Sequence, residues 1–167
     1  MLPMATKWHS FHRSPEAEVA VRVQTEDFDI AAEVRTLRSG NPKIGAVACF
    51  IGLVRDVNEN ATVAEMTLEH YPAMTRKALN GIVEEAKQRW DILDVLVVHR
   101  VGTLKPMDQI VLVVVASAHR GAAFAACEFI VDYLKTRAPF WKKEQTNKGT
   151  RWVEARDSDD DAAQRWN

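Results

Sequence analysis

Two lysines, Lys135 and Lys142, are seven positions apart on either side of a proline. Lys135 falls in the last turn of a predicted helix, and Lys142 follows two aromatic residues in a predicted strand. Pro139 ends the helix, so the chain can turn both ammonium groups toward one cleft. Neighbouring cations disfavour each other's protonation, and a lysine with a lowered pKa can act as a general base or a nucleophile. A purely structural role for Lys135, paired with Asp132 at the helix end, remains open.

Arg55 follows a buried strand predicted over residues 45–54. A guanidinium group at such a strand end can hold an anion with paired hydrogen bonds in the same cleft as the lysines. The alternative is an exposed arginine in a turn, paired with Asp56 or Glu59.

His119 and Arg120 lie between a very apolar strand and an alanine-rich helix. Free backbone N–H groups and the positive end of the helix dipole favour an anion at such a turn, and a group the size of phosphate fits this chemistry. Capping or surface pairing is the alternative role. Residues 119–143 carry five lysines and arginines against two acids, although the whole chain has a net charge of −1.

The elements that must position these residues follow from hydrophobic periodicity. We expect strands near residues 19–23, 45–54, 63–71, 95–101, 109–118, 140–146 and 151–155, and helices over 30–37, 72–90 and 121–137. Asp27 is the expected cap of the first helix. Strands interleaved with helices and hairpins indicate an α+β fold with a mixed sheet and packed helices.

Residues 1–18 mix proline, serine, histidine and charged residues without periodicity, which predicts a flexible leader. The length of 167 residues predicts a single domain, expected over residues 19–167. The near-neutral net charge argues against a nucleic-acid partner, and the longest apolar run, residues 110–116, is too short to cross a membrane. Cys49 and Cys127 are far apart in the sequence, with no spacing suited to a metal, so no metal site is predicted, and no cofactor is expected. They are interpreted as reduced core thiols, and the expected location of the protein is therefore the cytoplasm. His70 and His99 are interpreted as ordinary sheet residues.

The chain resembles the family of the catalytic, larger subunits of molybdopterin synthase. Five runs over residues 44–166 carry the resemblance: Phe50–Arg55, Leu68–Met74, Ser117–Arg120, Asp132–Glu144 and Arg151–Ala155. The run YLKTRAPFWKKE within the fourth is long and specific.

The resemblance implies a fold of the α/β-hammerhead kind and a sulfur transfer that converts cyclic pyranopterin monophosphate to molybdopterin. The implied sulfur donor is a thiocarboxylate at the C-terminal Gly-Gly of a small ubiquitin-like partner, in a heterotetramer built on a homodimer. Lys135 and Lys142 resemble the catalytic pair. The positions that resemble substrate-binding residues are Leu53, Val54, Arg55, His119, Arg120, Lys135, Lys142, Lys143, Glu144 and Arg156.

An alternative function from another class is an RNA or single-strand nucleic-acid binding module. Such a module would use arginine and lysine side chains with Phe140 and Trp141 as stacking surfaces. It predicts an affinity that falls steeply with salt.

Overall fold

The computed structural model describes residues 20–153 and 157–167. In chain order the elements are β1 (Val21–Gln24), α1 (Ile30–Arg38), β2 (Ala46–Leu53), β3 (Val57–Asn58), β4 (Ala61–His70), α2 (Pro72–Arg89), β5 (Asp94–Arg100), β6 (Gly102–Leu104), β7 (Gln109–Ser117), α3 (Arg120–Thr136), β8 (Phe140–Thr146), β9 (Gly149–Val153) and α4 (Asp157–Gln164).

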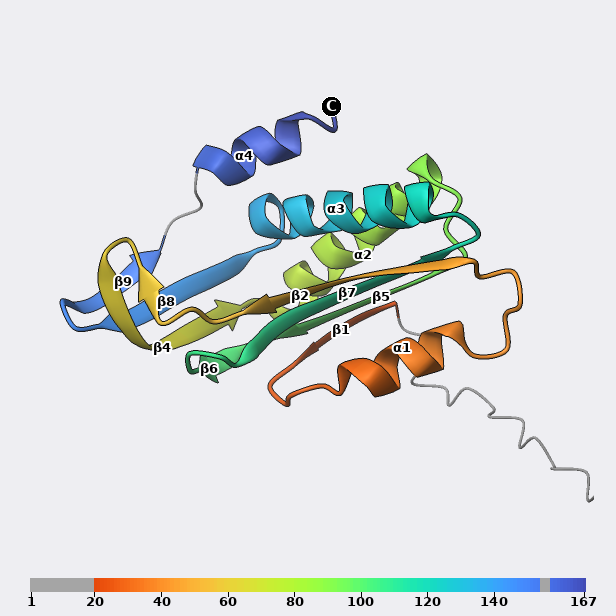
Figure 1. Ribbon diagram of the computed structural model, residues 1–167. Coiled ribbons are helices and arrows are strands. Elements are labelled where there is room, and N and C mark those ends of the chain that lie inside the picture. Colours follow the sequence, from red (N-terminus) through yellow and green to blue (C-terminus); the bar gives the residue numbers. More distant parts are fainter. Residues whose placement is uncertain (1–19, 154–156) are drawn as a thin grey trace, which may run out of the picture.

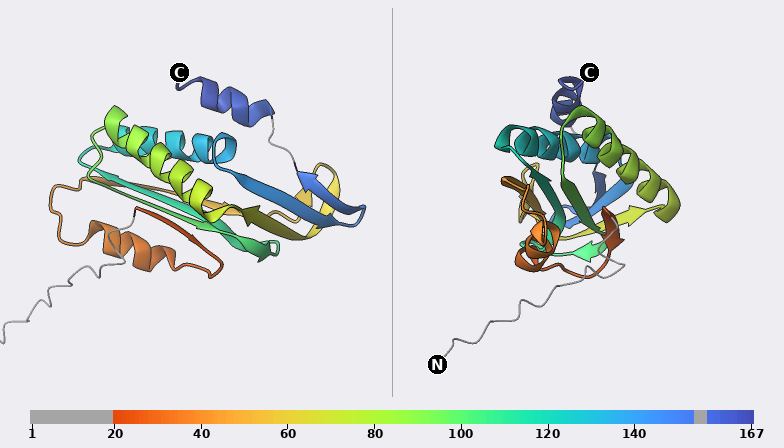
Figure 2. Two further views of the ribbon diagram at one scale, coloured as in Figure 1. Left: turned by 180° about the vertical axis from the view of Figure 1, so that it is seen from behind. Right: turned by 90° about the vertical axis from the view of Figure 1, so that its right-hand side faces the viewer.

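The first sheet has four strands in the order β1-β5-β7-β2. The β1–β5 pair is parallel and the other two pairs are antiparallel. Helices α2 and α3 cover one face of this sheet, and α1 covers part of the other (Figure 1). The view along the molecule in Figure 2 shows the resulting layers.

The burial of β7 explains why its sequence is almost uninterruptedly apolar. Val113 and Val115 pack against α2 and α3, whereas Leu112 and Val114, on the opposite face, pack against α1. A strand covered on both faces has no polar side to show in its sequence.

The second sheet is antiparallel, with the order β3-β4-β8-β9 and with β6 also paired to β4. The β3–β4 hairpin turns at Glu59 and Asn60, which both have positive φ, as two-residue hairpin turns with the favoured twist require. Strand β8 follows α3 directly, so the Lys135 end of α3 lies beside this second sheet.

Helix α1 begins where its sequence predicts, but with a different cap. The carboxylate of Asp29 accepts a hydrogen bond from the Ala32 N–H at 3.0 Å. The expectation that Asp27 is the cap is wrong, because Asp29 directly precedes the helix and reaches the free N–H groups of its first turn. Asp27 instead accepts a hydrogen bond from the side chain of Gln109 at 2.8 Å.

Helix α4 was not predicted, and it packs on α3 (Figure 1). Buried Asp132 of α3 accepts hydrogen bonds from Arg165 at 2.8 Å and from the Trp166 indole at 2.7 Å. The Trp166 ring also contacts Trp90 and Phe129 edge-on. An acidic helix with few apolar residues has little periodicity of its own, so its position depends on these tertiary contacts.

The predicted α+β class is confirmed, with the strands divided between two sheets. The short strands β3 and β6 were not predicted. Cys127 is buried as expected. The core position expected for Cys49 is wrong, because its side chain is exposed on the edge strand β2, whereas α1 packs on β5 and β7.

Three predicted segments lie outside the described residues: the leader over 1–18, residue 19 at the start of the first predicted strand, and residues 154–155 at the end of the last. Within the described part, no helix has the length and apolar character to cross a membrane.

Candidate active site

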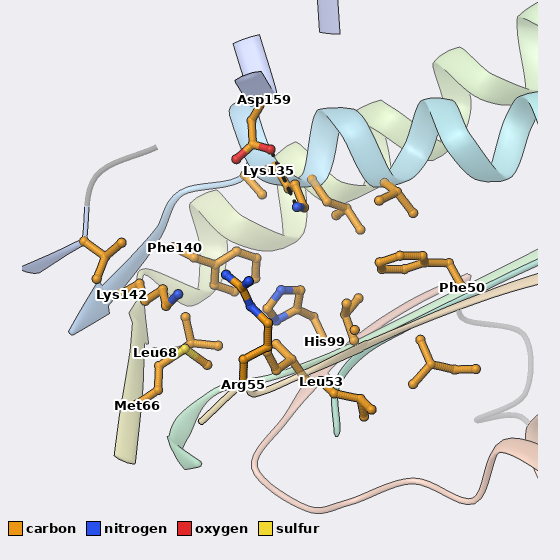
Figure 3. A pocket seen from close by; sticks show the side chains of 18 residues that line it. Phe50, Leu53, Arg55, Met66, Leu68, His99, Lys135, Phe140, Lys142 and Asp159 are labelled. Carbon is orange, nitrogen blue, oxygen red and sulfur yellow. Dashed lines mark ion pairs between the residues drawn. The ribbon is translucent and has the colours of Figure 1, made fainter. Parts of the chain in front are cut away.

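A pocket of about 600 Å³ opens where the two sheets meet the C-terminal end of α3. Strands β2, β4, β5, β7, β8 and β9 contribute to its wall, as do α3 and α4 (Figure 3). Its volume falls in the range of small-molecule sites. Eighteen of the described residues line it: Phe50, Ile51, Gly52, Leu53, Arg55, Met66, Leu68, His99, Ile110, Val111, Val131, Leu134, Lys135, Ala138, Phe140, Lys142, Val153 and Asp159.

The pocket has an apolar wall built around Phe140. Phe140 follows Pro139 directly, and its ring stacks on the His99 imidazole with centroids 3.9 Å apart and planes inclined by 14°. Met66 and Leu68, both buried, lie on the neighbouring strand β4. A planar heterocycle can bind against such a surface, because aromatic and aliphatic side chains exclude water from its faces.

Among the described residues, three cationic side chains point into this pocket from three different parts of the chain (Figure 3). Lys135 comes from the end of α3, Lys142 from β8, and Arg55 from the loop after β2. The structure therefore brings together both lysines of the predicted catalytic pair and the predicted anion-binding arginine. An anionic ligand is the chemistry that such a group of donors favours.

Lys142 is held by a nearly buried carboxylate. Its ammonium lies 2.9 Å from Oε1 of Glu144, whose side chain is only 2% exposed. The Asn58 amide donates to both oxygens of Glu144 at 2.9 and 3.0 Å, and Arg151 donates to Oε2 at 3.1 Å. Burial alone would raise the pKa of Glu144, but the hydrogen bonds from Asn58 and Lys142, with the charge of Lys142 and the bond from Arg151, outweigh it and lower the pKa.

Lys135 is paired with α4 rather than with its own helix. Its ammonium lies 3.6 Å from a carboxylate oxygen of Asp159 (Figure 3). The partner expected from the sequence, Asp132, is instead taken by Arg165 and Trp166. The Lys135 side chain is about half exposed, at 54%, so the pair with Asp159 can open without a large cost.

Arg55 bonds to neither acid expected from the sequence. Its guanidinium donates to the Asn58 side-chain oxygen at 3.4 Å, whereas Glu59 pairs with Arg151 at 3.0 Å. Leu53 lines the main pocket. A smaller adjoining cavity of about 50 Å³ is lined by Leu53, Val54, Arg55, Asn58, Met66, Ile110, Lys142 and Glu144. Val54 and Glu144 therefore border this smaller cavity and not the main pocket.

His119 and Arg120 do not reach this pocket within one chain. Both are exposed and lie at the N-terminal end of α3. Lys135 lies near the other end of this 17-residue helix, about 20 Å away at 1.5 Å per residue.

Lys143 and Arg156 complete the predicted set. Lys143 does not line the pocket, because side chains alternate between the two faces of β8 and that of Lys143 lies on the face opposite to Lys142. Its ammonium lies 5.6 Å from the centre of the Trp152 ring. Arg156 lies outside the described residues.

The two aromatic residues at the start of β8 also lie on different faces. Trp141 is on the face of Lys143 and contacts Tyr71 edge-on, whereas Phe140 faces the pocket. Phe140 and Trp141 therefore lie on opposite faces of β8 and do not form one stacking surface.

Sequence reasoning missed several members of this site. Asp159 and Asn58 are distant in sequence from their partners Lys135 and Glu144, so no local pattern pointed to them. His99 was interpreted as an ordinary sheet residue although it lines the pocket. Its signal was a polar residue on the same strand face as the fully buried Val97.

Known proteins share this fold and much of this sequence. The MoaE protein family matches residues 23–137. A molybdopterin synthase catalytic subunit from Ralstonia nicotianae is 66% identical over 146 residues, which are 87% of this chain and 83% of that protein. The structure of the molybdopterin biosynthesis MoaE protein from Burkholderia ambifaria is 60% identical, with a TM-score of 0.76 over 88% of this chain and 97% of that one. A complex of subunits 1 and 2 of molybdopterin-converting factor from Helicobacter pylori shares the fold, with a TM-score of 0.68 at 18% identity, covering 83% of this chain and 92% of that one.

The fold and these relatives define a molybdopterin synthase, an enzyme of molybdenum cofactor biosynthesis. The chain belongs to the MoaE family, and the resemblance predicted from the sequence is confirmed.

Proposed function

We propose that this chain catalyses sulfur transfer to cyclic pyranopterin monophosphate, and that the sulfur comes from a thiocarboxylate at the C-terminal Gly-Gly of a small ubiquitin-like partner. The observation that carries the proposal is the convergence of Lys135, Lys142 and Arg55 on one pocket with an apolar wall. Both reactants are anions, and the substrate is also a planar heterocycle, so a pocket with these two properties fits them.

A Gly-Gly tail suits the access to this pocket. Residues without side chains take little space, so such a tail can bring its terminal anion close to Lys135. The complex of subunits 1 and 2 from Helicobacter pylori, which shares the fold, supports a small partner subunit for this chain. We expect the tail to replace Asp159 as the anion beside Lys135, because the pair between these two side chains is partly exposed.

The lysines have different surroundings and are assigned different roles. Lys135, with a partly exposed partner, stabilises the thiocarboxylate, while Lys142, fixed by Glu144, moves protons as each C–S bond forms. In each transfer the thiocarboxylate sulfur bonds to a substrate carbon that loses an oxygen substituent. Water then cleaves the bond between acyl carbon and sulfur, so two transfers exchange two substrate oxygens for two sulfurs and leave two carboxylate tails, without an oxidant or a reductant.

The experiment that tests this function uses the Lys135→Ala variant. With thiocarboxylated partner and cyclic pyranopterin monophosphate, we expect at least a 100-fold loss of product formation, measured by mass spectrometry, because removal of one group that stabilises developing charge typically costs ~10²–10³ in rate. Lys77→Ala, which removes an exposed lysine of α2, is the matched control and should keep the normal rate. Normal turnover by a folded Lys135→Ala protein would exclude the proposed role of this lysine.

We further propose that His119 and Arg120 bind the substrate phosphate in the pocket of a second copy of the chain, within the homodimer that the family resemblance implies. The length of α3 separates them from the pocket of their own chain, which supports a site shared between copies.

Mixed dimers test this arrangement. Arg120→Ala and Lys135→Ala chains, each inactive alone, should recover about one quarter of wild-type activity when mixed by refolding, because half of the dimers are then mixed and each has one complete site. If Arg120 serves its own chain's pocket, no mixed dimer has a complete site and the mixture stays inactive. The cytoplasmic location remains a prediction from the sequence.

A further inference from the structure

His99 is the one polar side chain in the pocket wall without a charge or a charged partner, among the described residues. It lies on β5, is only 8% exposed, and stacks on Phe140 with a centroid distance of 3.9 Å. Figure 3 shows the imidazole beside Phe140 in the middle of the group of pocket side chains. Its ring is therefore fixed in place before any ligand binds.

The hydrogen bond on the inner nitrogen fixes the tautomer of this imidazole. Nδ1 of His99 lies 2.8 Å from the Arg100 carbonyl oxygen, which can only accept a hydrogen bond, so Nδ1 has the proton. Burial lowers the pKa of His99 to about 4, and the charge of nearby His70 contributes to the shift, so the ring is neutral near pH 7. Nε2 then has a free lone pair and can only accept.

Nε2 supplies what the other polar groups of the pocket lack. Lys135, Lys142 and Arg55 can only donate hydrogen bonds, and the Asp159 carboxylate lies on the far side of Lys135 from His99 and Phe140 (Figure 3). No residue of the described chain donates a hydrogen bond to Nε2 of His99. A pyranopterin has N–H and O–H donors on its rings as well as an anionic phosphate, so it needs an acceptor against the apolar wall, since an unpaired buried donor weakens binding.

We propose that Nε2 of His99 accepts a hydrogen bond from a ring N–H or O–H of the pyranopterin and thereby fixes the orientation of the heterocycle on Phe140. This inference rests on the proposed function and adds a substrate-binding residue to it. The cations then hold the anionic groups, and His99 selects for a heterocycle with a donor at the matching position.

Three substitutions of His99 separate the acceptor from the ring. His99→Phe keeps a stacked ring without nitrogens, and His99→Asn keeps a donor toward the Arg100 carbonyl but has no acceptor at the Nε2 position. His99→Gln can place an amide oxygen near that position. We expect the Kd for cyclic pyranopterin monophosphate, measured by quenching of pterin fluorescence, to rise about 10-fold in the Phe and Asn variants and less than about 3-fold in the Gln variant.

Two controls make the result specific. The Kd for inorganic phosphate should stay unchanged in all three variants, because Nε2 of His99 does not bind the phosphate group. His70→Phe, which changes the other histidine near Phe140 (6.2 Å between centroids), should leave both affinities unchanged, since His70 does not line the pocket.

Wild-type affinity for pyranopterin in the folded Asn and Phe variants would overturn the proposal for His99 and leave the proposed sulfur transfer intact. An equal loss in the His70→Phe variant would also overturn it, because a general disturbance of Phe140 would then explain the effect. Failure of the wild-type chain to bind pyranopterin at all would refute the proposed function, and the role of His99 with it.

Discussion

The Glu144→Gln substitution tests the carboxylate that holds Lys142. The new amide would keep the size of the side chain but remove its charge, and one of its two terminal atoms would become a donor facing the donors of Asn58 and Lys142. Removal of one partner from a fully buried ion pair costs ~3–5 kcal/mol. Because Lys142 and Arg151 are about one-third exposed, at 34% and 32%, water offsets part of that loss.

We therefore expect Glu144→Gln to lower the free energy of unfolding by about 2–3 kcal/mol at pH 7, which corresponds to a fall in Tm of about 5–10 °C for a chain of this size. Calorimetry or a thermal melt monitored by circular dichroism measures both. Sulfur transfer should fall as well, because the ammonium group of Lys142 is no longer fixed in the pocket.

The pH dependence of this difference has a definite sign. Since the folded-state pKa of Glu144 is below its ordinary value of 4.5, the carboxylate stabilises the fold fully above that value. The stabilisation is lost as the pH falls through the lowered pKa, where the protein must take up a proton. The difference in Tm between wild type and Glu144→Gln should thus be largest near neutral pH and shrink below about pH 4.5.

Glu69→Gln on β4 is the matched control, because its side chain is exposed, and it should change stability by less than about 0.5 kcal/mol. A Glu144→Gln protein with the Tm of the wild type at pH 7 would refute the view that this carboxylate is a stabilising centre of the site.

Three further predictions concern contacts of the helices. Asp159→Asn should change Tm by less than about 3 °C, because its pair with Lys135 is partly exposed; a larger fall in a thermal melt would show that the pair fixes α4. Asp132→Ala should let trypsin release the C-terminal segment several-fold faster, as Arg165 and Trp166 lose their acceptor, and unchanged proteolysis would contradict this anchoring role. Asp29→Ala should cost about 1 kcal/mol in a denaturant titration, whereas Asp29→Asn should cost little, since asparagine also caps helices; equal losses would contradict the assigned cap.

Local patterns in the sequence predicted most of the framework correctly. Pro72 and Pro139 mark the start of α2 and the break between α3 and β8, because proline fits a first helical turn and restricts the residue before it. Apolar periodicity identified the long strands and helices. The elements that it missed, β3, β6 and α4, are too short or too polar for periodicity to show them, and pairing or docking with distant residues positions each of them.

The candidate site divides in the same way. Lys135 and Lys142 were identified from residues close together in the chain, since a helix end, a proline and a strand start give their relation locally. The partners of these two lysines differ in how well the sequence could predict them. Glu144 follows Lys142 by two positions on the same strand face, whereas Asp159 reaches Lys135 only because α4 folds back over α3.

The amino-acid sequence alone thus determined the α+β class, the family resemblance and the bend that joins the two lysines, because these depend on hydrophobic period, residue identity and backbone restrictions over a few positions. Only the tertiary structure decided that β2, β5, α3 and β8 meet around one pocket and that His99 faces it. The reason is physical: sheet order and helix docking bring together residues that no local period relates.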